Sequence, residues 1–140
     1  MVSPATSLKD MLISDGVAVL NSGSWLVRVG RLVETQDQLI TLMDTPGQNP
    51  NPKWLVEYPT VQALIRGAID DYDGGWTKAK AVKDALLGRD PEVVNGDSYD
   101  AITGLGDLSF LMWDQKNRPI FVMNFRLIVE PASGTHREAL

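Results

Sequence analysis

The sequence predicts an α+β fold, in which an antiparallel or mixed sheet of four to five strands carries one long helix (about residues 76–87) across one face. A short helix precedes the sheet at the N-terminus. Three observations support this: helical periodicity is confined to the two helices, strand-like apolar segments lie on both sides of the long helix, and 140 residues suit one domain. We expect this domain to cover residues 1–131 and the polar residues 132–140 to form a flexible tail.

The N-terminal helix is predicted from a start signal, an apolar face and a stop signal. Residues 7–10, Ser-Leu-Lys-Asp, resemble a capping box with Asp in place of Glu, in which a hydroxyl and a carboxylate satisfy the first free N–H groups. Leu8, Met11 and Leu12 then share one helical face. Gly16 supplies a stop, because glycine tolerates the left-handed conformation that follows many helices.

Two strands are predicted at residues 25–32 and 38–44, which are rich in Val, Leu, Ile and Thr, with a hairpin at 33–37 between them. A third strand is predicted at 60–69, where apolar residues alternate. The intervening residues 45–59 contain four prolines, which fix φ and withhold backbone donors, so they predict an extended loop. Loops of this length are uncommon in compact domains unless they serve a function.

The long helix is predicted from one apolar stripe. Its members are Trp76, Ala79, Val82 and Leu86. Gly88 lies where a C-terminal cap belongs. An irregular segment follows and runs from Asp90-Pro91 to about residue 97.

The C-terminal third is predicted to be all strand, at residues 98–104 and 107–113 and from Pro119 to about Glu130. The last strand buries one alternating face, which consists of Phe121, Met123, Phe125, Leu127 and Val129. Its other face carries Ile120, Val122 and Arg126. That face is too apolar for open solvent and yet contains an arginine, so we expect a helix or another subunit to cover half of it.

The composition excludes several classes of function. The chain has no cysteine and one histidine, His136, which removes disulfides, Cys-ligated zinc and thiol catalysis. Asp and Glu number 18 against 13 Lys and Arg, a net charge of −5, so binding to bare phosphate backbone is not expected. No apolar run approaches the roughly 18–20 residues that span a bilayer, and the start lacks a secretory signal. We therefore predict an intracellular protein with no enzymatic activity, cofactor, metal or membrane partner.

The acidic cluster Asp70, Asp71 and Asp73 is the exception that could hold a cation. A calcium loop of the EF-hand type needs Glu at its twelfth position, and the twelfth residue from Asp71 is Val82, so this motif fails. We interpret the cluster as a strand-to-helix turn, with Asp73 at the positive end of the helix dipole. The alternative is a weak magnesium or calcium contact, which leaves open a small metal-dependent hydrolase that uses Asp70–Asp73.

Arg28, Arg66 and Arg126 all lie in predicted strands. Each can extend past the sheet edge to pair with a carboxylate, or it can mark a subunit interface, where arginine is enriched. Trp54, at the end of the proline-rich loop, can likewise be a core residue or an anchor for a partner.

Three blocks of sequence follow one another in a recognisable order. The first is Asn51-Pro52-Lys53-Trp54 leading into residues 59–67, the second is Tyr72 with the helix at 79–88, and the third is the hairpin at 106–130. Together these blocks resemble the tail terminator proteins of long-tailed bacteriophages, which are often catalogued as minor capsid proteins.

The resemblance implies a structural virion protein that forms a six-fold ring at the head-proximal end of the tail tube. The ring stops tube growth and joins the tail to the neck, and DNA passes through its lumen without sequence-specific binding. The implied partners are further copies of the chain, the tail tube protein and a head-completion or neck protein. The implied location is the virion, after assembly in the host cytoplasm. The alternative within this class is a head-completion or neck adaptor.

A ring of identical copies needs two different surfaces on each copy. The loop at residues 46–53 and the partly apolar face of the last strand are our candidates. The predicted interface residues are Asn51, Lys53, Trp54, Arg66, Arg118, Ile120, Val122 and Arg126.

Overall fold

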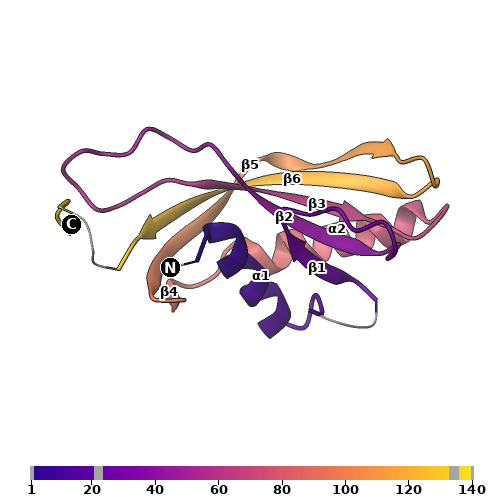
Figure 1. Cartoon of the computed structure of the whole chain (residues 1–140), viewed down its shortest axis with the longest axis horizontal. Coiled ribbons are helices and arrows are strands. Elements are labelled where there is room, and N and C mark those ends of the chain that lie inside the picture. The colour runs from indigo at the N-terminus through magenta and orange to yellow at the C-terminus, as the bar shows by residue number, and fades with distance from the viewer. Residues whose placement is uncertain (1, 21–23, 133–135, 140) are drawn as a thin grey trace.

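The computed structural model describes residues 2–20, 24–132 and 136–139, and this part of the chain contains two helices and six strands. In chain order they are α1 Pro4–Ser14, β1 Leu26–Val29, β2 Leu39–Thr45, β3 Thr60–Arg66, α2 Tyr72–Leu86, β4 Glu92–Val94, β5 Asp97–Trp113 and β6 Pro119–Glu130. The molecule is elongated, and β5 and β6 follow its long axis (Figure 1).

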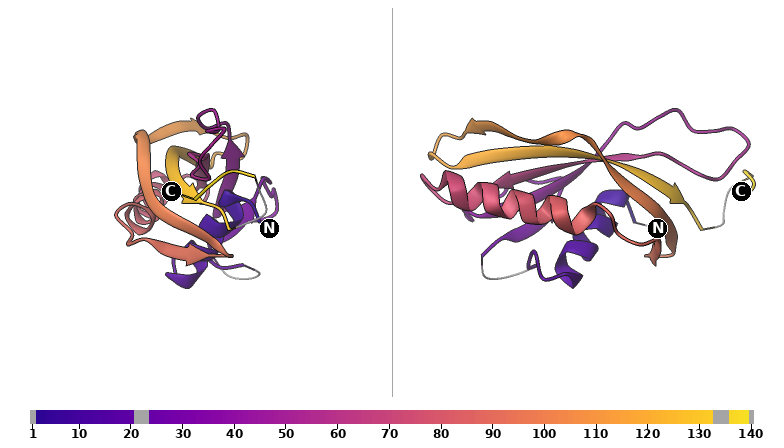
Figure 2. Two further views of the ribbon diagram at one scale, coloured as in Figure 1. Left: turned by 90° about the vertical axis from the view of Figure 1, so that its left-hand side faces the viewer. Right: turned by 180° about the vertical axis from the view of Figure 1, so that it is seen from behind.

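The strands form one mixed sheet in the order β1-β2-β3-β6-β5-β4. Neighbouring strands are antiparallel except β1 and β2, which are parallel with Leu26 opposite Leu39. The sheet is curled, and both helices pack on the same side of it, where they share one apolar core with β2, β3 and β6 (Figure 2). The predicted α+β class is confirmed, but the sheet has six strands rather than four to five.

The hairpin predicted at residues 33–37 is wrong. Because β1 and β2 are parallel, both strands start at the same end of the sheet. Residues 30–38 must therefore run back from the end of β1 to the level of its start before β2 begins. Gly30 N donates to Leu42 O at 2.8 Å, and Thr41 Oγ1 donates to Arg31 O at 2.8 Å, so the connection lies against β2. Apolar alternation does not reveal strand direction, which is why the sequence suggested the simpler hairpin.

The segments predicted as two strands, 98–104 and 107–113, are one strand of 17 residues, β5. Its register with β6 shifts between Leu105 and Ser109, and Gly106 there has a φ of 76°. The glycine permits this conformation, and the shift is a bulge inside a continuous strand.

A second hairpin occupies the segment predicted to be irregular. β4 pairs with the start of β5, with Val94 opposite Asp97. Asn95 and Gly96 between them have φ values of 52° and 87°, the left-handed conformation of a two-residue hairpin turn. The Asn-Gly pair is a local signal for this hairpin, although the segment was predicted to be irregular.

α1 begins one turn earlier than predicted. Ser3 is its N-cap and accepts a hydrogen bond from Thr6 N, and Pro4 occupies the first turn. Ser7 is therefore inside the helix, fully buried, and its hydroxyl lies 3.2 Å from Asn95 Nδ2, which donates to it. The stop is confirmed, because Gly16 has a φ of 75° just after the last residues.

α2 also begins earlier, at Tyr72, and Asp71 is its N-cap. The buried stripe consists of Gly75, Ala79, Val82 and Leu86. Trp76 was predicted in this stripe but is 39% exposed. Gly75 takes its place on the buried face, because α2 approaches Phe121 closely at that position. Gly88 follows the helix with a φ of 71°, as expected of a C-terminal stop.

The alternation predicted for β6 is confirmed. Its five odd-numbered apolar residues from Phe121 to Val129 are all buried, and the residues between them are half-buried. β3 ends at Arg66, earlier than predicted, and Ile69 beyond it is 51% exposed. Gly67 N still donates to Pro119 O at the start of β6, and the chain then leaves the sheet and enters α2.

Residues 46–59 form the predicted extended loop, which reaches away from the sheet at the end of the molecule that also holds the C-terminus (Figure 1). Leu55 N donates to Glu138 O at 2.6 Å, and Glu138 N donates to Lys53 O at 2.8 Å. Residues 133–135 and 140 of the predicted tail lie outside the described residues, so its flexibility stays a prediction. No helix in the described part of the chain is long and apolar enough to cross a membrane.

Candidate functional site

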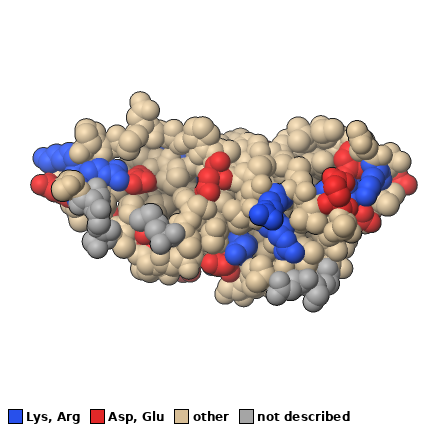
Figure 3. Space-filling model, in the orientation of Figure 1, with Lys and Arg blue, Asp and Glu red and all other residues tan. Residues whose placement is uncertain are grey.

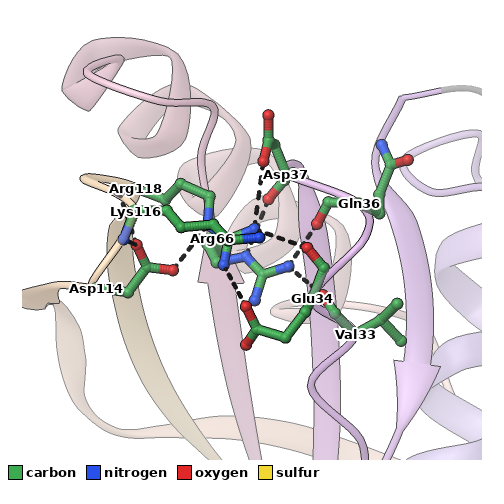
Figure 4. A network of polar contacts seen from close by, with 8 residues as sticks. All are labelled: Val33, Glu34, Gln36, Asp37, Arg66, Asp114, Lys116 and Arg118. Carbon is green, nitrogen blue, oxygen red and sulfur yellow. Dashed lines mark hydrogen bonds and ion pairs between the residues drawn. The ribbon is translucent and has the colours of Figure 1, made fainter.

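A polar network lies at the tip where β5 turns into β6 (Figure 4). Arg118 is 1% exposed, and its guanidinium binds three carboxylates. Nε donates to Asp114 Oδ2 at 2.7 Å, Nη2 to Glu34 Oε2 at 3.0 Å and Nη1 to Asp37 Oδ1 at 3.2 Å. Burial alone would lower the pKa of Arg118, but these carboxylates raise it. The cation therefore stays charged and fixes residues 30–38 to the tip.

Arg66 completes the network from the end of β3. Its Nε donates to Asp37 O at 3.0 Å, and its Nη2 donates to Val33 O and Gln36 O. Burial and the neighbouring Arg118 lower the pKa of Arg66. Both arginines were predicted at an interface. They are buried within one chain and hold a connection, and a contact of either with a neighbouring copy stays a prediction.

The outer face of β6 carries three of the predicted interface residues, Ile120, Val122 and Arg126, and all three are half-buried. Val122 lies between Leu64 of β3 and Ser109 of β5 in the sheet. The Arg126 guanidinium lies 5.6 Å from the centre of the Tyr58 ring, a cation–π contact with the loop. Packing against neighbouring strands and the loop accounts for part of their burial, and a contact with a second subunit stays a prediction.

The remaining predicted residues lie at the far end of the proline-rich loop. Asn51 Oδ1 accepts hydrogen bonds from Lys53 N at 2.8 Å and Trp54 N at 2.9 Å, which form a tight turn. The Lys53 ammonium lies 4.7 Å from the centre of the Trp54 ring. Trp54 is half-buried, so its burial does not decide between a core residue and an anchor for a partner. The loop that carries Asn51 and Lys53 lies at one end of the molecule, opposite the turn between β5 and β6 (Figure 1).

The acidic cluster acts as a helix start. Asp71 Oδ1 accepts a hydrogen bond from Gly74 N at 3.0 Å, and Asp73 lies in the first turn of α2, as interpreted from the sequence. Among the described residues, no group of three or more His, Asp or Glu side chains is arranged to hold a metal ion.

An aromatic patch formed by α2 and β5 was not predicted from the sequence. Tyr72, Trp76, Phe110 and Trp113 surround the buried Phe121, and they are 36–43% exposed. Tyr72 lies 5.3 Å from Phe110 and 6.2 Å from Trp113, between ring centres. Phe110 and Trp76 are 5.7 and 5.9 Å from Phe121. The run Phe110-Leu111-Met112-Trp113 was the available signal, because four consecutive apolar residues cannot all face one buried side of a strand.

The backbone edge beside this patch is open within the described chain. β4 pairs only with residues 97–99 of β5, so the outer edge of the rest of β5 has no strand beside it. Leu111 and Met112 on this edge are 52% and 50% exposed. A long apolar edge of this kind normally marks a contact with another chain.

Comparison with known proteins agrees with a structural role. One solved chain from the "Virion of native gene transfer agent (GTA) particle" has the same fold, with a TM-score of 0.69, 15% sequence identity, and coverage of 91% of this chain and 95% of that chain. No curated protein sequence matches. The model of the bacteriophage tail terminator protein family matches residues 11–131. The chain thus shares the fold of that solved chain. By the match over residues 11–131, it belongs to the bacteriophage tail terminator family.

Proposed function

We propose that this protein is a tail terminator that closes the head-proximal end of a phage tail tube as a ring of six copies. The family match over residues 11–131 is the observation that carries the proposal. The ring stops polymerisation of the tube protein and joins the tail to a head-completion or neck protein. The chain acts in the virion, after assembly in the host cytoplasm.

The exposed surfaces support assembly. The aromatic patch and the open edge of β5 offer apolar area to a neighbour, and the proline-rich loop offers an extended arm at the other end. Two unlike surfaces on each copy are what a closed ring of head-to-tail contacts requires.

The charge of the chain suits a conduit for DNA. Net charge is −5, and DNA passes a mildly acidic lumen without being held by its phosphates. In this proposal the acidic cluster has a structural part, in which Asp71 caps α2.

The test is polymerisation of the cognate tail tube protein with and without this chain, followed by electron microscopy. We expect shorter tubes that carry a cap at one end only. Tubes of unchanged length, with the chain left free in solution, would contradict the proposal.

A further inference from the structure

The aromatic patch has a defined chemical character. Three partly exposed aromatic side chains, Tyr72, Phe110 and Trp113, contact one another, and Trp76 joins them through the buried Phe121. Aromatic residues are enriched at the centres of protein interfaces. Three exposed carboxylates, on Asp70, Asp71 and Asp73, follow directly before and within the first turn of α2, beside Tyr72. None of the three is in an ion pair within the described residues. A partner surface that complements this patch would be apolar and would carry positive charge.

The opposite edge of the sheet, at β1, has that character. Val19, Leu20 and Leu32 are 38%, 44% and 52% exposed. Arg28 Nη1 donates to Leu20 O, so this cation lies beside the exposed leucine. Arg31, just beyond β1, is exposed.

The positive charge on this edge is also uncompensated. Lys78 of α2 reaches across to it, where Nζ donates to Val17 O at 3.0 Å. Arg28, Arg31 and Lys78 form no ion pair anywhere in the part of the chain that is described. Figure 3 shows Lys and Arg atoms gathered over the region where Figure 1 draws β1 and α1. We name five residues of this edge, Val19, Leu20, Arg28, Arg31 and Leu32, the β1-edge surface.

We propose that the aromatic patch of one copy packs against the β1-edge surface of the next copy, an inference that rests on the proposed ring. The two surfaces are both apolar at the centre and carry unpaired charge of opposite sign, so they complement each other. They lie at the two different edges of one sheet. A contact between unlike surfaces repeats from copy to copy and closes into a ring when the rotation allows it.

Charge reversal tests the pairing directly. Asp73→Lys and Arg31→Glu each place like charges in the contact, and we expect each to raise the concentration that caps half of the tubes by about tenfold. An equimolar mixture of the two variants should recover wild-type capping. In a ring in which the two variants alternate, the introduced lysine meets the introduced glutamate at one contact. At the next contact the native Asp73 meets the native Arg31, so opposite charges meet at both. Asp84→Lys is the control, since Asp84 is on the same helix outside the patch and pairs with Lys80.

A matched pair of variants tests the apolar part of the contact. Leu111→Ser removes an exposed leucine of β5 beside the patch, and we expect about tenfold weaker capping. Val93→Ser removes a side chain of β4 that is 70% exposed and outside the patch, and capping should not change. Both side chains are exposed, and circular dichroism verifies that both variants are folded.

The outcomes separate this inference from the proposed function. Normal capping by the single variants, or a mixture that fails to recover, overturns the contact between copies, while capping by the wild-type chain keeps the terminator role. A wild-type chain that caps no tubes removes the proposed function and this inference together.

Discussion

Arg118 shows how one buried cation organises the tip of the molecule. Its guanidinium satisfies carboxylates from two distant segments, Glu34 and Asp37 on one side and Asp114 on the other. From the sequence, Arg118 was predicted only as an interface residue. Its partners could not be selected from the sequence, because Arg118 is separated by about 80 residues from two of them.

Asp114→Asn tests this network through pH. Burial would raise the pKa of Asp114, but hydrogen bonds from the Arg118 backbone and guanidinium and from Lys116 N lower it below its ordinary value of 3.8. Its contribution is therefore complete above pH 3.8 and is lost as the pH falls through the depressed folded-state pKa. We expect the variant to lose about 1–3 kcal/mol of unfolding free energy at pH 7 and progressively less at lower pH.

Urea unfolding of the variant and the wild type at pH 7 and pH 3 provides the measurement. Asp84→Asn serves as the control, since its exposed pair with Lys80 contributes little. A difference between Asp114→Asn and wild type that is the same at both pH values would rule out this origin of the stabilisation.

At the scale of elements, the position of α2 depends on the missing side chain of Gly75. A Cβ atom there would lie 2.7 Å from Phe121 Cε2 and 3.4 Å from Pro119 Cγ. Alanine favours a helix over glycine by about 1 kcal/mol, but overpacking against a buried ring costs about 1–3 kcal/mol.

We therefore expect Gly75→Ala to lower the midpoint of thermal unfolding despite its better helix propensity. Thr77→Ala, at an exposed position of the same helix, should leave it unchanged or raise it slightly. A Gly75→Ala protein at least as stable as wild type would show that α2 does not need this close approach.

The proline-rich loop gives a second prediction at this scale. Deletion of residues 47–52 should leave a folded chain, because the hydrogen bonds of Lys53 and Leu55 to Glu138 lie outside the deleted segment. The shortened chain should no longer cap tubes, since the arm that presents Asn51 is lost. Circular dichroism tests folding and electron microscopy tests capping; unimpaired capping would remove the loop from the assembly mechanism.

The elements that the sequence predicted well are those with local signals. The alternation of apolar residues predicted β6, and their helical period predicted α2. The prolines predicted the extended loop. The parallel pairing of β1 with β2 has no local signal, because it depends on the contacts of residues 30–38 with Arg66 and Arg118. The aromatic patch was missed for a similar reason: Tyr72 and Phe110 meet only after the sheet forms.

At the scale of the whole molecule, the described chain has different features at its two ends and its two edges. The extended loop and residues 136–138 form one end, and the Arg118 network forms the other (Figure 1). An aromatic, acidic patch borders β5, and a basic, apolar surface borders β1. This asymmetry suits a chain that contacts its own copies around a ring and other proteins above and below it.

Cryo-electron microscopy of capped tubes, averaged down the tube axis, tests this account most directly. We expect one six-fold ring of about 92 kDa, for six chains of 15.4 kDa, at the end of each tube, with the β1 edge of each copy beside α2 and β5 of the next. Bare tube ends, or this chain found as isolated copies on the tube wall, would contradict it.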